Sequence, residues 1–339
     1  MNNTDSAHRK AIIGNPKGTF WLYDSTTGFD LTHPPTPTSA SPTPNHTVST
    51  TTLPITICPV KSALVIIDMQ NFFLSPQLGR PSDSKGLLAQ QQLLKYAIPA
   101  ARKAGMRIIW LNWGLTEADI ASMPPGTLRA FGFETVLADQ FESYATIEQK
   151  QAAVDSHGVN EGCDKIHAHG VDAKIEVAPG KNPRIYKGLG TDIGPVVVAS
   201  DDGHDAQVEG GRLLMRDTWN ADLTPELRQV YEQGLNADPP DVWIHKNRMS
   251  GLWGASTNCT EFLDGHGIKT LFFAGVNTDQ CVGGSLQDAY SKGYDVILLS
   301  DGCGTTSPAS SQESIEFNCA KTWGFCTSCK DFAKGLGLE

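Results

Sequence analysis

This sequence of 339 residues lacks any apolar run long enough to cross a membrane. A spanning helix needs about 18 or more consecutive apolar residues, and the longest apolar stretches here are far shorter. The N-terminal residues also lack the apolar core of a secretory signal peptide. We therefore expect no membrane partner.

The cysteine pattern lacks the regularity of a disulfide framework. Eight cysteines are spread over the chain, and most of them lie inside apolar stretches typical of strands or helices. Free thiols of this kind are typical of a reducing compartment. We expect a cytoplasmic protein.

Basic runs are missing as well. The formal net charge is -10, from 37 acidic and 27 basic residues, and nowhere do Lys and Arg cluster. A protein without a basic patch cannot neutralise many phosphates, so nucleic acid is excluded as a partner. A small molecule remains the expected ligand.

Residues 32–52 have few apolar side chains. They are nearly all Pro, Thr, Ser and Asn, which favours an unstructured linker. The aromatic stretch 18–31 before it is either an arm that docks on the body or on a neighbouring subunit, or an unstructured leader. We therefore divide the chain into an N-terminal arm and linker, 1–60, and a main domain, 61–339.

The main domain alternates apolar strand patterns with amphipathic helix patterns. Strands with apolar residues on both faces favour a parallel sheet that helices cover on both sides. The predicted fold is a three-layer α/β/α, Rossmann-like fold with a mostly parallel sheet of about six strands. Expected strands are 62–70, 106–113, 241–246, 270–276, 294–302 and a short one near 325; expected helices are 87–105, 257–265, one from 281 and one from about 310.

Three of these strands end at chemically capable side chains, Asp68, Lys246 and Cys281. Carboxyl ends of parallel strands share one edge of the sheet, where ligands bind, so the three residues should converge. Cys281 also stands at the start of a helix, whose dipole favours the thiolate. An acid, a lysine and a thiol together indicate a nucleophilic site.

Several segments resemble the isochorismatase-like cysteine hydrolases in order and spacing. They are VIIDMQNFF (65–73), IHKNRMSGLWG (244–254), GVNTDQCV (275–282) and LLSDGCGTTSP (298–308). The resemblance implies that Cys281 is the nucleophile, Asp68 its base and Lys246 the third member of the triad. It also implies a cis peptide before Asn277, whose N–H would form an oxyanion hole with that of Cys281.

The sequence departs from metal-binding members of that family. These members carry an Asp-x-His pattern after the second strand, whereas LNWGLTEADI (111–120) has no histidine. Cys163, His167 and His169 lie near one another, but no fourth ligand has recognisable spacing. We expect no metal and no cofactor, which counts against a nicotinamidase.

A long insertion from about 127 to 240 is a second departure. It contains a hairpin pattern around 201–205 and a helix that begins near Pro225. We interpret it as a cap over the cleft or an oligomer contact, and the resemblance implies a homo-oligomer, a dimer or tetramer. Candidates to contact substrate are Phe72, Asn112, Trp113, Arg129, Trp219 and Trp253, with Arg216 beside Trp219.

The function predicted from these residues is hydrolysis of a C–N bond in a small amide, ureide or lactam through a thioester on Cys281. Two alternatives remain open at this point. One is hydrolysis of a vinyl ether in an isochorismate-like acid. The other is a ligand-binding or regulatory protein that has this fold and little activity.

Overall fold

A computed structural model describes residues 7–141, 173–177, 181–199 and 205–338. The Cys163, His167 and His169 cluster and most of the turn at 201–205 lie outside these residues. None of the helices in the described part is both long and apolar enough to span a bilayer.

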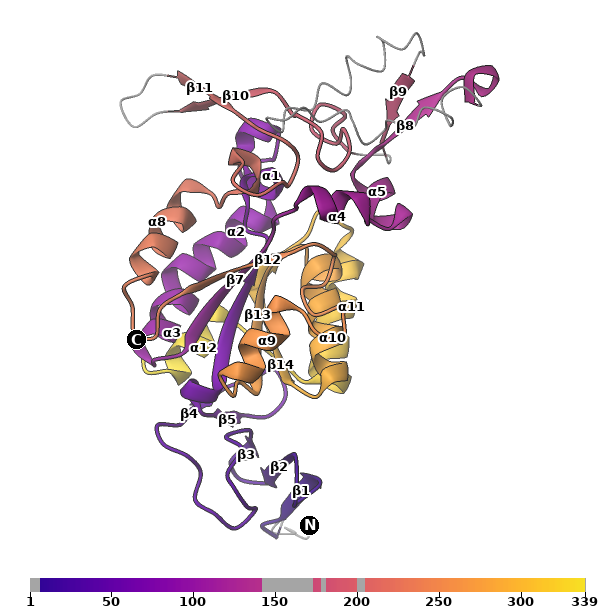
Figure 1. Ribbon diagram of the computed structural model, residues 1–339. Coiled ribbons are helices and arrows are strands. Elements are labelled where there is room, and N and C mark those ends of the chain that lie inside the picture. The colour runs from indigo at the N-terminus through magenta and orange to yellow at the C-terminus, as the bar shows by residue number, and fades with distance from the viewer. Residues whose placement is uncertain (1–6, 142–172, 178–180, 200–204, 339) are drawn as a thin grey trace, which may run out of the picture.

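The core of the molecule is a six-stranded sheet in which all strands run parallel (Figure 1). The fold class predicted from the sequence is therefore confirmed. The strand with TLFFAGV is buried along its whole length, because apolar residues occupy both of its faces. In spatial order the strands are β12 (Val242–Lys246), β7 (Arg107–Trp113), β6 (Ser62–Ile67), β13 (Thr270–Val276), β14 (Asp295–Gly304) and β15 (Phe325–Thr327).

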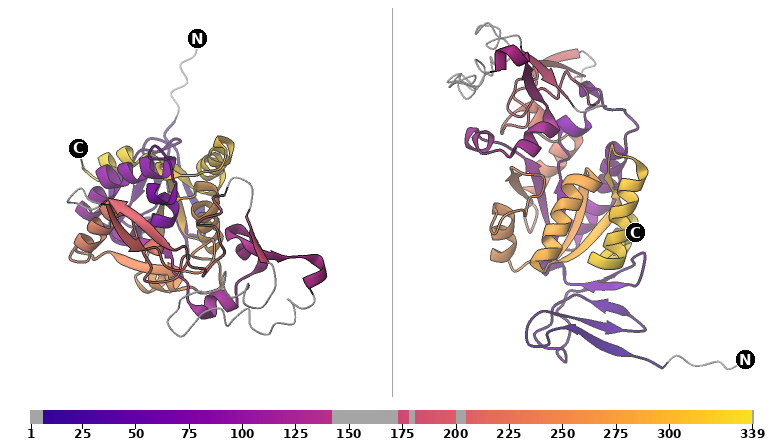
Figure 2. Two further views of the ribbon diagram at one scale, coloured as in Figure 1. Left: turned by 90° about the horizontal axis from the view of Figure 1, so that it is seen from above. Right: turned by 90° about the vertical axis from the view of Figure 1, so that its right-hand side faces the viewer.

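Helices cover both faces of this sheet (Figures 1 and 2). One apolar core lies under α2 (Lys85–Gln92), η3 (Leu93–Ala97), α3 (Ile98–Lys103), α8 (Pro225–Gly234) and α12 (Cys329–Gly335). The other lies under α9 (Asn258–Gly265), α10 (Gly283–Lys292), α11 (Ala309–Asn318) and η8 (Cys319–Trp323). The expected helix 87–105 is thus α2, η3 and α3 in succession. The last helix, α12, was not expected.

The N-terminal residues form a second sheet, at the end of the molecule that carries the amino ends of the parallel strands (Figure 2). Its order is β1 (Lys10–Gly14), β2 (Phe20–Asp24), β3 (Gly28–Asp30), β5 (Ile55–Ile57) and β4 (His46–Val48). The expected linker 32–52 therefore contains a strand. Its polar composition concealed Val48, which is fully buried against the main core.

A buried carboxylate fastens the N-terminal sheet to the main domain. Asp295, the first residue of β14, accepts hydrogen bonds from Trp21 Nε1, His33 Nε2 and Thr270 Oγ1, each at 2.7 Å. The Trp21 ring also packs on Phe325, with 5.6 Å between ring centroids. Of the alternatives for the aromatic stretch, the structure shows docking on the chain's own body.

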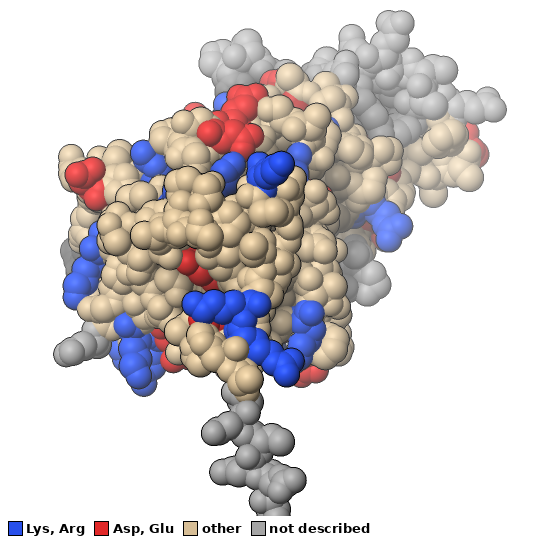
Figure 3. Space-filling view, turned by 90° about the horizontal axis from the view of Figure 1, so that it is seen from below, with Lys and Arg blue, Asp and Glu red and all other residues tan. Residues whose placement is uncertain are grey.

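Charged side chains of both signs are found at this end of the molecule (Figure 3). Lys and Arg lie in several separate places, Asp and Glu are distributed between them, and uncharged residues make up most of the face. Such a mixed surface agrees with the scattered charges in the sequence.

The opposite end carries the segment between β7 and β12 (Figure 1). It comprises α4 (Glu117–Ala121), α5 (Pro125–Phe131), η4 (Ala138–Gln140), η6 (Trp219–Ala221) and two antiparallel pairs, β8 (Phe133–Val136) with β9 (Ala173–Glu176) and β10 (Pro195–Ala199) with β11 (Asp205–Glu209). The hairpin expected around 201–205 is confirmed by the β10 and β11 pairing. The boundaries 1–60, 61–339 and 127–240 stay predictions.

Candidate active site

Asp68 is the first residue after β6 and is fully buried. Its φ of 53° lies in the left-handed region, which Asp tolerates better than most residues do. This conformation turns the side chain toward β7, where Oδ1 accepts a hydrogen bond from the backbone N–H of Trp113 at 3.0 Å. The carboxylate is thus fixed at the carboxyl edge of the sheet.

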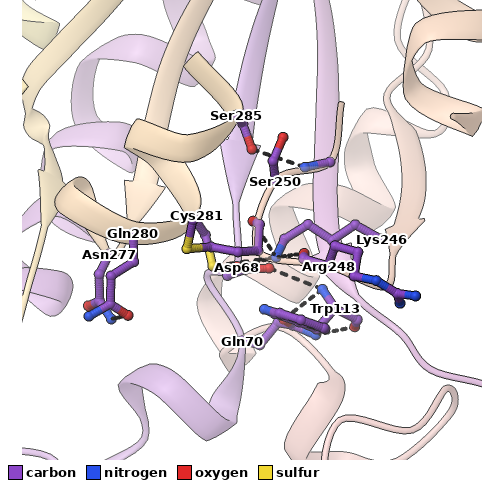
Figure 4. Close-up of polar contacts among 12 residues, drawn as sticks. Asp68, Gln70, Trp113, Lys246, Arg248, Ser250, Asn277, Gln280, Cys281 and Ser285 are labelled. Carbon is purple, nitrogen blue, oxygen red and sulfur yellow. Dashed lines mark hydrogen bonds and ion pairs between the residues drawn. The ribbon is translucent and has the colours of Figure 1, made fainter. Parts of the chain in front are cut away.

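Lys246 brings its ammonium group to both of the other predicted site residues. Its Nζ lies 2.9 Å from Asp68 Oδ2 and 3.5 Å from Cys281 Sγ (Figure 4). The side chains of Asp68 and Lys246 are both at most 1% exposed. The convergence expected from the strand ends is therefore present in the structure.

Further contacts hold the ammonium group in place. Lys246 Nζ donates to the carbonyls of Arg248 and Met249, at 3.1 and 3.2 Å. It also lies 4.0 Å from the centroid of the Trp113 ring, a cation–π distance. Carbonyls, a carboxylate and an aromatic face all favour a positive charge, so Lys246 is built into the site as a cation.

Cys281 lies in η7 (Thr278–Val282), the turn that joins β13 to α10. The peptide bond between Val276 and Asn277 is cis, as the resemblance implied. Only 7% of the Cys281 surface is exposed. The predicted strand-to-helix position of this cysteine is confirmed.

The expected bias of Cys281 toward thiolate is wrong. Burial raises the pKa of the Cys281 thiol to about 12, and the negative charge of Asp68 adds to this rise. The Lys246 ammonium opposes the rise without cancelling it. A helix start in a buried site, beside a carboxylate, is thus not enough to ionise the thiol.

The pKa of Asp68 is also raised, because burial penalises its carboxylate. Lys246 and a hydrogen bond from the Cys281 thiol pull the pKa in the opposite direction. The 2.9 Å ion pair with Lys246 leads us to assign a carboxylate at Asp68, and the raised pKa of Cys281 a neutral thiol beside it. This arrangement supplies a base beside the thiol rather than a free thiolate.

We predict that Lys246→Met destabilises the protein by about 3 to 5 kcal/mol at pH 7, because it leaves the Asp68 charge buried without a partner. A carboxyl group whose pKa is higher in the folded than in the unfolded protein stabilises the fold most at pH values below its ordinary pKa. That stabilisation is lost as the pH rises toward and through the pKa of the folded state. Without Lys246 the Asp68 pKa rises further, so the deficit should grow from pH 4 to pH 7.

Urea unfolding of the variant at several pH values measures this deficit. Lys95→Met is the matched control, because Lys95 is exposed and its ammonium group lies over the ring of Tyr96 without an ion pair to any described residue. An equal deficit at pH 4 and pH 7 would contradict the assignment of a buried Asp68 charge.

Gln70 was not among the predicted site residues, yet its side chain connects the end of β7 with η6. Its Nε2 donates to the carbonyls of Trp113 at 2.7 Å and Ala221 at 2.5 Å, and its Oε1 accepts from Trp113 N at 3.1 Å. The next residue, Asn71, donates from Nδ2 to the carbonyl of Trp219. The DMQN motif therefore anchors η6 beside the carboxylate of Asp68. No local pattern in the sequence reveals this distant pairing.

We predict that Gln70→Ala lowers the free energy of unfolding by roughly 2 to 4 kcal/mol, because two buried carbonyls lose their donor. Chemical denaturation is the measurement. Gln91→Ala, an exposed position on α2, is the control and should change stability by less than about 0.5 kcal/mol. A loss as small as that of the control would show that water replaces the Gln70 amide.

The aromatic candidates Trp113 and Phe72 belong to one buried cluster. The Trp113 ring contacts Phe131 at 5.5 Å, and Phe72 contacts Phe131 at 6.1 Å and Tyr186 at 5.1 Å between ring centroids. Trp113 is the member that also contacts Lys246. Phe72 thus adjoins the site through Phe131.

The remaining candidates are spread around the site. Asn112 points to the face of β7 opposite to that of Trp113, because successive strand residues alternate. Arg129 is exposed on α5. Trp253 is 53% exposed and lines a cavity of about 220 Å³ with Lys246. Trp219 lies over a different cavity, together with Arg216.

No cluster of three or more His, Cys, Asp or Glu side chains suited to a metal ion occurs within the described ranges. A Cβ at Gly114 would lie 2.0 Å from His245 Nδ1, so the His245 ring fills the space of a side chain at position 114. The absence of a metal and a cofactor stays a prediction.

Comparison with known proteins places these features in a family. Residues 186–317 match the family model described as the isochorismatase domain. Ureidoacrylate amidohydrolase RutB of Agrobacterium fabrum is 24% identical over 286 residues, 82% of this chain and 91% of that protein. RutB of Rhizobium rhizogenes is 31% identical over 122 residues, 36% of this chain and 46% of that protein.

Solved structures are similar as well. A cysteine hydrolase from Pseudomonas syringae is 16% identical, with 82% of this chain and 93% of that chain covered and a TM-score of 0.46. The family-model match and the similarity to RutB support the isochorismatase-like cysteine hydrolase family, which the motifs predicted. The chain is a hydrolase.

Proposed function

We propose that this hydrolase cleaves a C–N bond of a small amide, ureide or lactam through a thioester on Cys281. The observation that carries the proposal is the position of Lys246 Nζ, 2.9 Å from a carboxylate and 3.5 Å from a thiol in a buried site. The similarity to amidohydrolases over most of the chain supports amide chemistry over vinyl-ether chemistry.

In the first half of the reaction, Asp68 takes the proton from the Cys281 thiol as Sγ attacks the carbonyl carbon. The backbone N–H groups of Asn277 and Cys281 stabilise the oxygen that becomes negative. The intermediate collapses when the C–N bond breaks, and Asp68 gives its proton to the departing nitrogen. A thioester on Cys281 and free ammonia or amine result.

In the second half, Asp68 accepts a proton from a water molecule that attacks the thioester. The C–S bond breaks, the proton returns to the sulfur, and the acid product leaves. Lys246 keeps Asp68 charged between these transfers despite its burial. The thiol thus becomes a nucleophile only as a substrate reacts, which is consistent with its raised pKa.

The test is release of ammonia or amine from a panel of primary amides, ureides and lactams, with Cys281→Ala as the blank. Mass spectrometry of quenched reactions should show an acyl adduct on Cys281. Release without any adduct, or release that persists in the blank, would refute the thioester. Turnover of an enol-ether acid with no C–N cleavage would establish the vinyl-ether alternative, and binding without turnover the regulatory one.

The substrate is a small molecule in this proposal. Assembly as a homo-oligomer and a cytoplasmic location stay predictions from the resemblance and from the composition.

A further inference from the structure

A cavity of about 530 Å³ lies beside the edge strand β12, and no residue of the triad lines it. We propose that it binds a planar aromatic ring that carries a hydrogen-bond acceptor. Its lining includes the rings of Trp219, Tyr231, Trp243 and His245 and two pairs of charged side chains, Arg216 with Arg228 and Asp217 with Asp222. This inference concerns a second site and does not depend on the proposed reaction.

Three separate elements build the walls of the cavity. Arg216 and Trp219 belong to the stretch that ends in η6, Tyr231 belongs to α8, and Trp243 belongs to β12. The hydrogen bonds from Gln70 and Asn71 to the η6 backbone hold the first of these elements against the sheet. The cavity is therefore part of the fixed structure.

The aromatic walls Trp219, Tyr231 and Trp243 are half-buried and pack against the edges of the two apolar cores. Tyr231 and Trp243 meet edge to face, with 5.3 Å between centroids and 67° between ring planes. Trp243 and His245 stand in the same relation, at 6.0 Å and 61°. Rings that meet at steep angles form the corner of a box, and a flat ligand can contact one by its face and another by its edge.

His245 offers a hydrogen-bond donor at this box. Its Nδ1 accepts from Trp243 Nε1 at 3.2 Å, which places the proton of the neutral ring on Nε2. Burial and the nearby Arg216 lower the pKa of His245, so the ring stays neutral near pH 7. The Nε2–H group is then the donor of a neutral imidazole.

The two arginines of the cavity differ in their partners. Arg228 is engaged by Asp222 at 3.0 Å and by Glu232 at 2.9 Å. Arg216 uses Nε to donate to the carbonyl of Gly114, and it forms no ion pair with any residue in the described part of the chain. Its outer nitrogens are the second source of donors for an acceptor on the ligand.

Location and size also suit a small ligand. The volume is within the range of about 300 to 1,000 Å³ that is typical of such sites, and Trp113 and His245 lie at the carboxyl ends of β7 and β12. None of Asp68, Lys246 and Cys281 lines this cavity, although Trp113 and His245, which adjoin Lys246, do.

The experiment is isothermal titration of the full chain with 2-naphthoate, and with cyclohexanecarboxylate, which carries the same charge without an aromatic ring. We expect measurable binding of 2-naphthoate only. Trp219→Leu and Tyr231→Leu should each weaken it at least about tenfold, because each removes an aromatic wall. Trp323→Leu is the control, since Trp323 is also half-buried but lies in η8, and should change the Kd less than twofold.

The rate at which iodoacetamide alkylates Cys281 shows which site is filled. Saturating 2-naphthoate should leave this rate unchanged, whereas binding beside Cys281 would slow it. Equal affinity for the two acids, protection of Cys281, or equal losses in Trp219→Leu and Trp323→Leu would each overturn the proposal. Circular dichroism shows which variants are folded. If Trp219→Leu is not folded, the affinity of Tyr231→Leu for 2-naphthoate decides the test.

Discussion

Cys281→Ala is expected to lower kcat/KM by at least about 10,000-fold, because it removes the atom that attacks the substrate. The fold should survive, since the change deletes one buried sulfur atom and costs about 1 kcal/mol of stability. Product release and urea unfolding of the same preparation measure both effects.

Cys303→Ala is the matched control. Cys303 is buried in the same apolar core, and its sulfur donates a long hydrogen bond of 3.8 Å to the carbonyl of Phe273. Its loss should cost a similar amount of stability and leave turnover within about threefold, because Cys303 forms no hydrogen bond with Asp68 or Lys246, both of which the structure describes. Full activity in Cys281→Ala, or its loss in both variants, would contradict the assigned nucleophile.

Asp68→Asn is expected to lower kcat by about 100- to 10,000-fold, because an amide cannot accept the thiol proton. The same change should make the thiol more acidic. The Asp68 charge raises the pKa of Cys281, so its removal favours the thiolate beside Lys246. The midpoint of Cys281 alkylation against pH should fall by at least about one pH unit.

In this variant kcat should fall while the Cys281 thiol becomes more acidic. This combination distinguishes a base from a residue that only supports the fold. A purely structural role would lower activity and leave the thiol pKa as it is. Exposure of the thiol to solvent would also lower its pKa, and circular dichroism of the variant identifies that case because it requires a disturbed fold. Asp83→Asn, at an exposed position, is the control and should change neither quantity. An alkylation midpoint that moves to higher pH in Asp68→Asn would refute the assigned electrostatics.

Much of the central sheet could be predicted from the sequence, because its strands are apolar on both faces. The strand expected at 270–276 is β13 residue for residue, and Asp68, Lys246 and Cys281 converge as the shared edge of a parallel sheet requires. Local pattern and global fold agree at these positions.

Other features depend on burial and on distant contacts that no local pattern contains. The thiol pKa of Cys281 is set by how much solvent the folded chain excludes, and this outweighs the helix start. Val48 is buried within a polar stretch, so composition alone indicated a linker. Gln70 bonds to Ala221, 151 positions away, and only the fold brings them together.

The hydrogen bonds that Trp21 and His33 donate to Asp295 limit how this protein can be shortened for engineering. A fragment that starts at Lys61 would retain every strand of the parallel sheet, but one of the two apolar cores would lose Leu31, Val48, Ile55 and Ile57. It would also strip Trp21 and His33 from a buried carboxylate and uncover the ring of Phe325. An unpaired charge beside an exposed apolar surface favours self-association. The smallest well-behaved unit therefore includes the N-terminal sheet, although that sheet lies at the end of the molecule away from the triad.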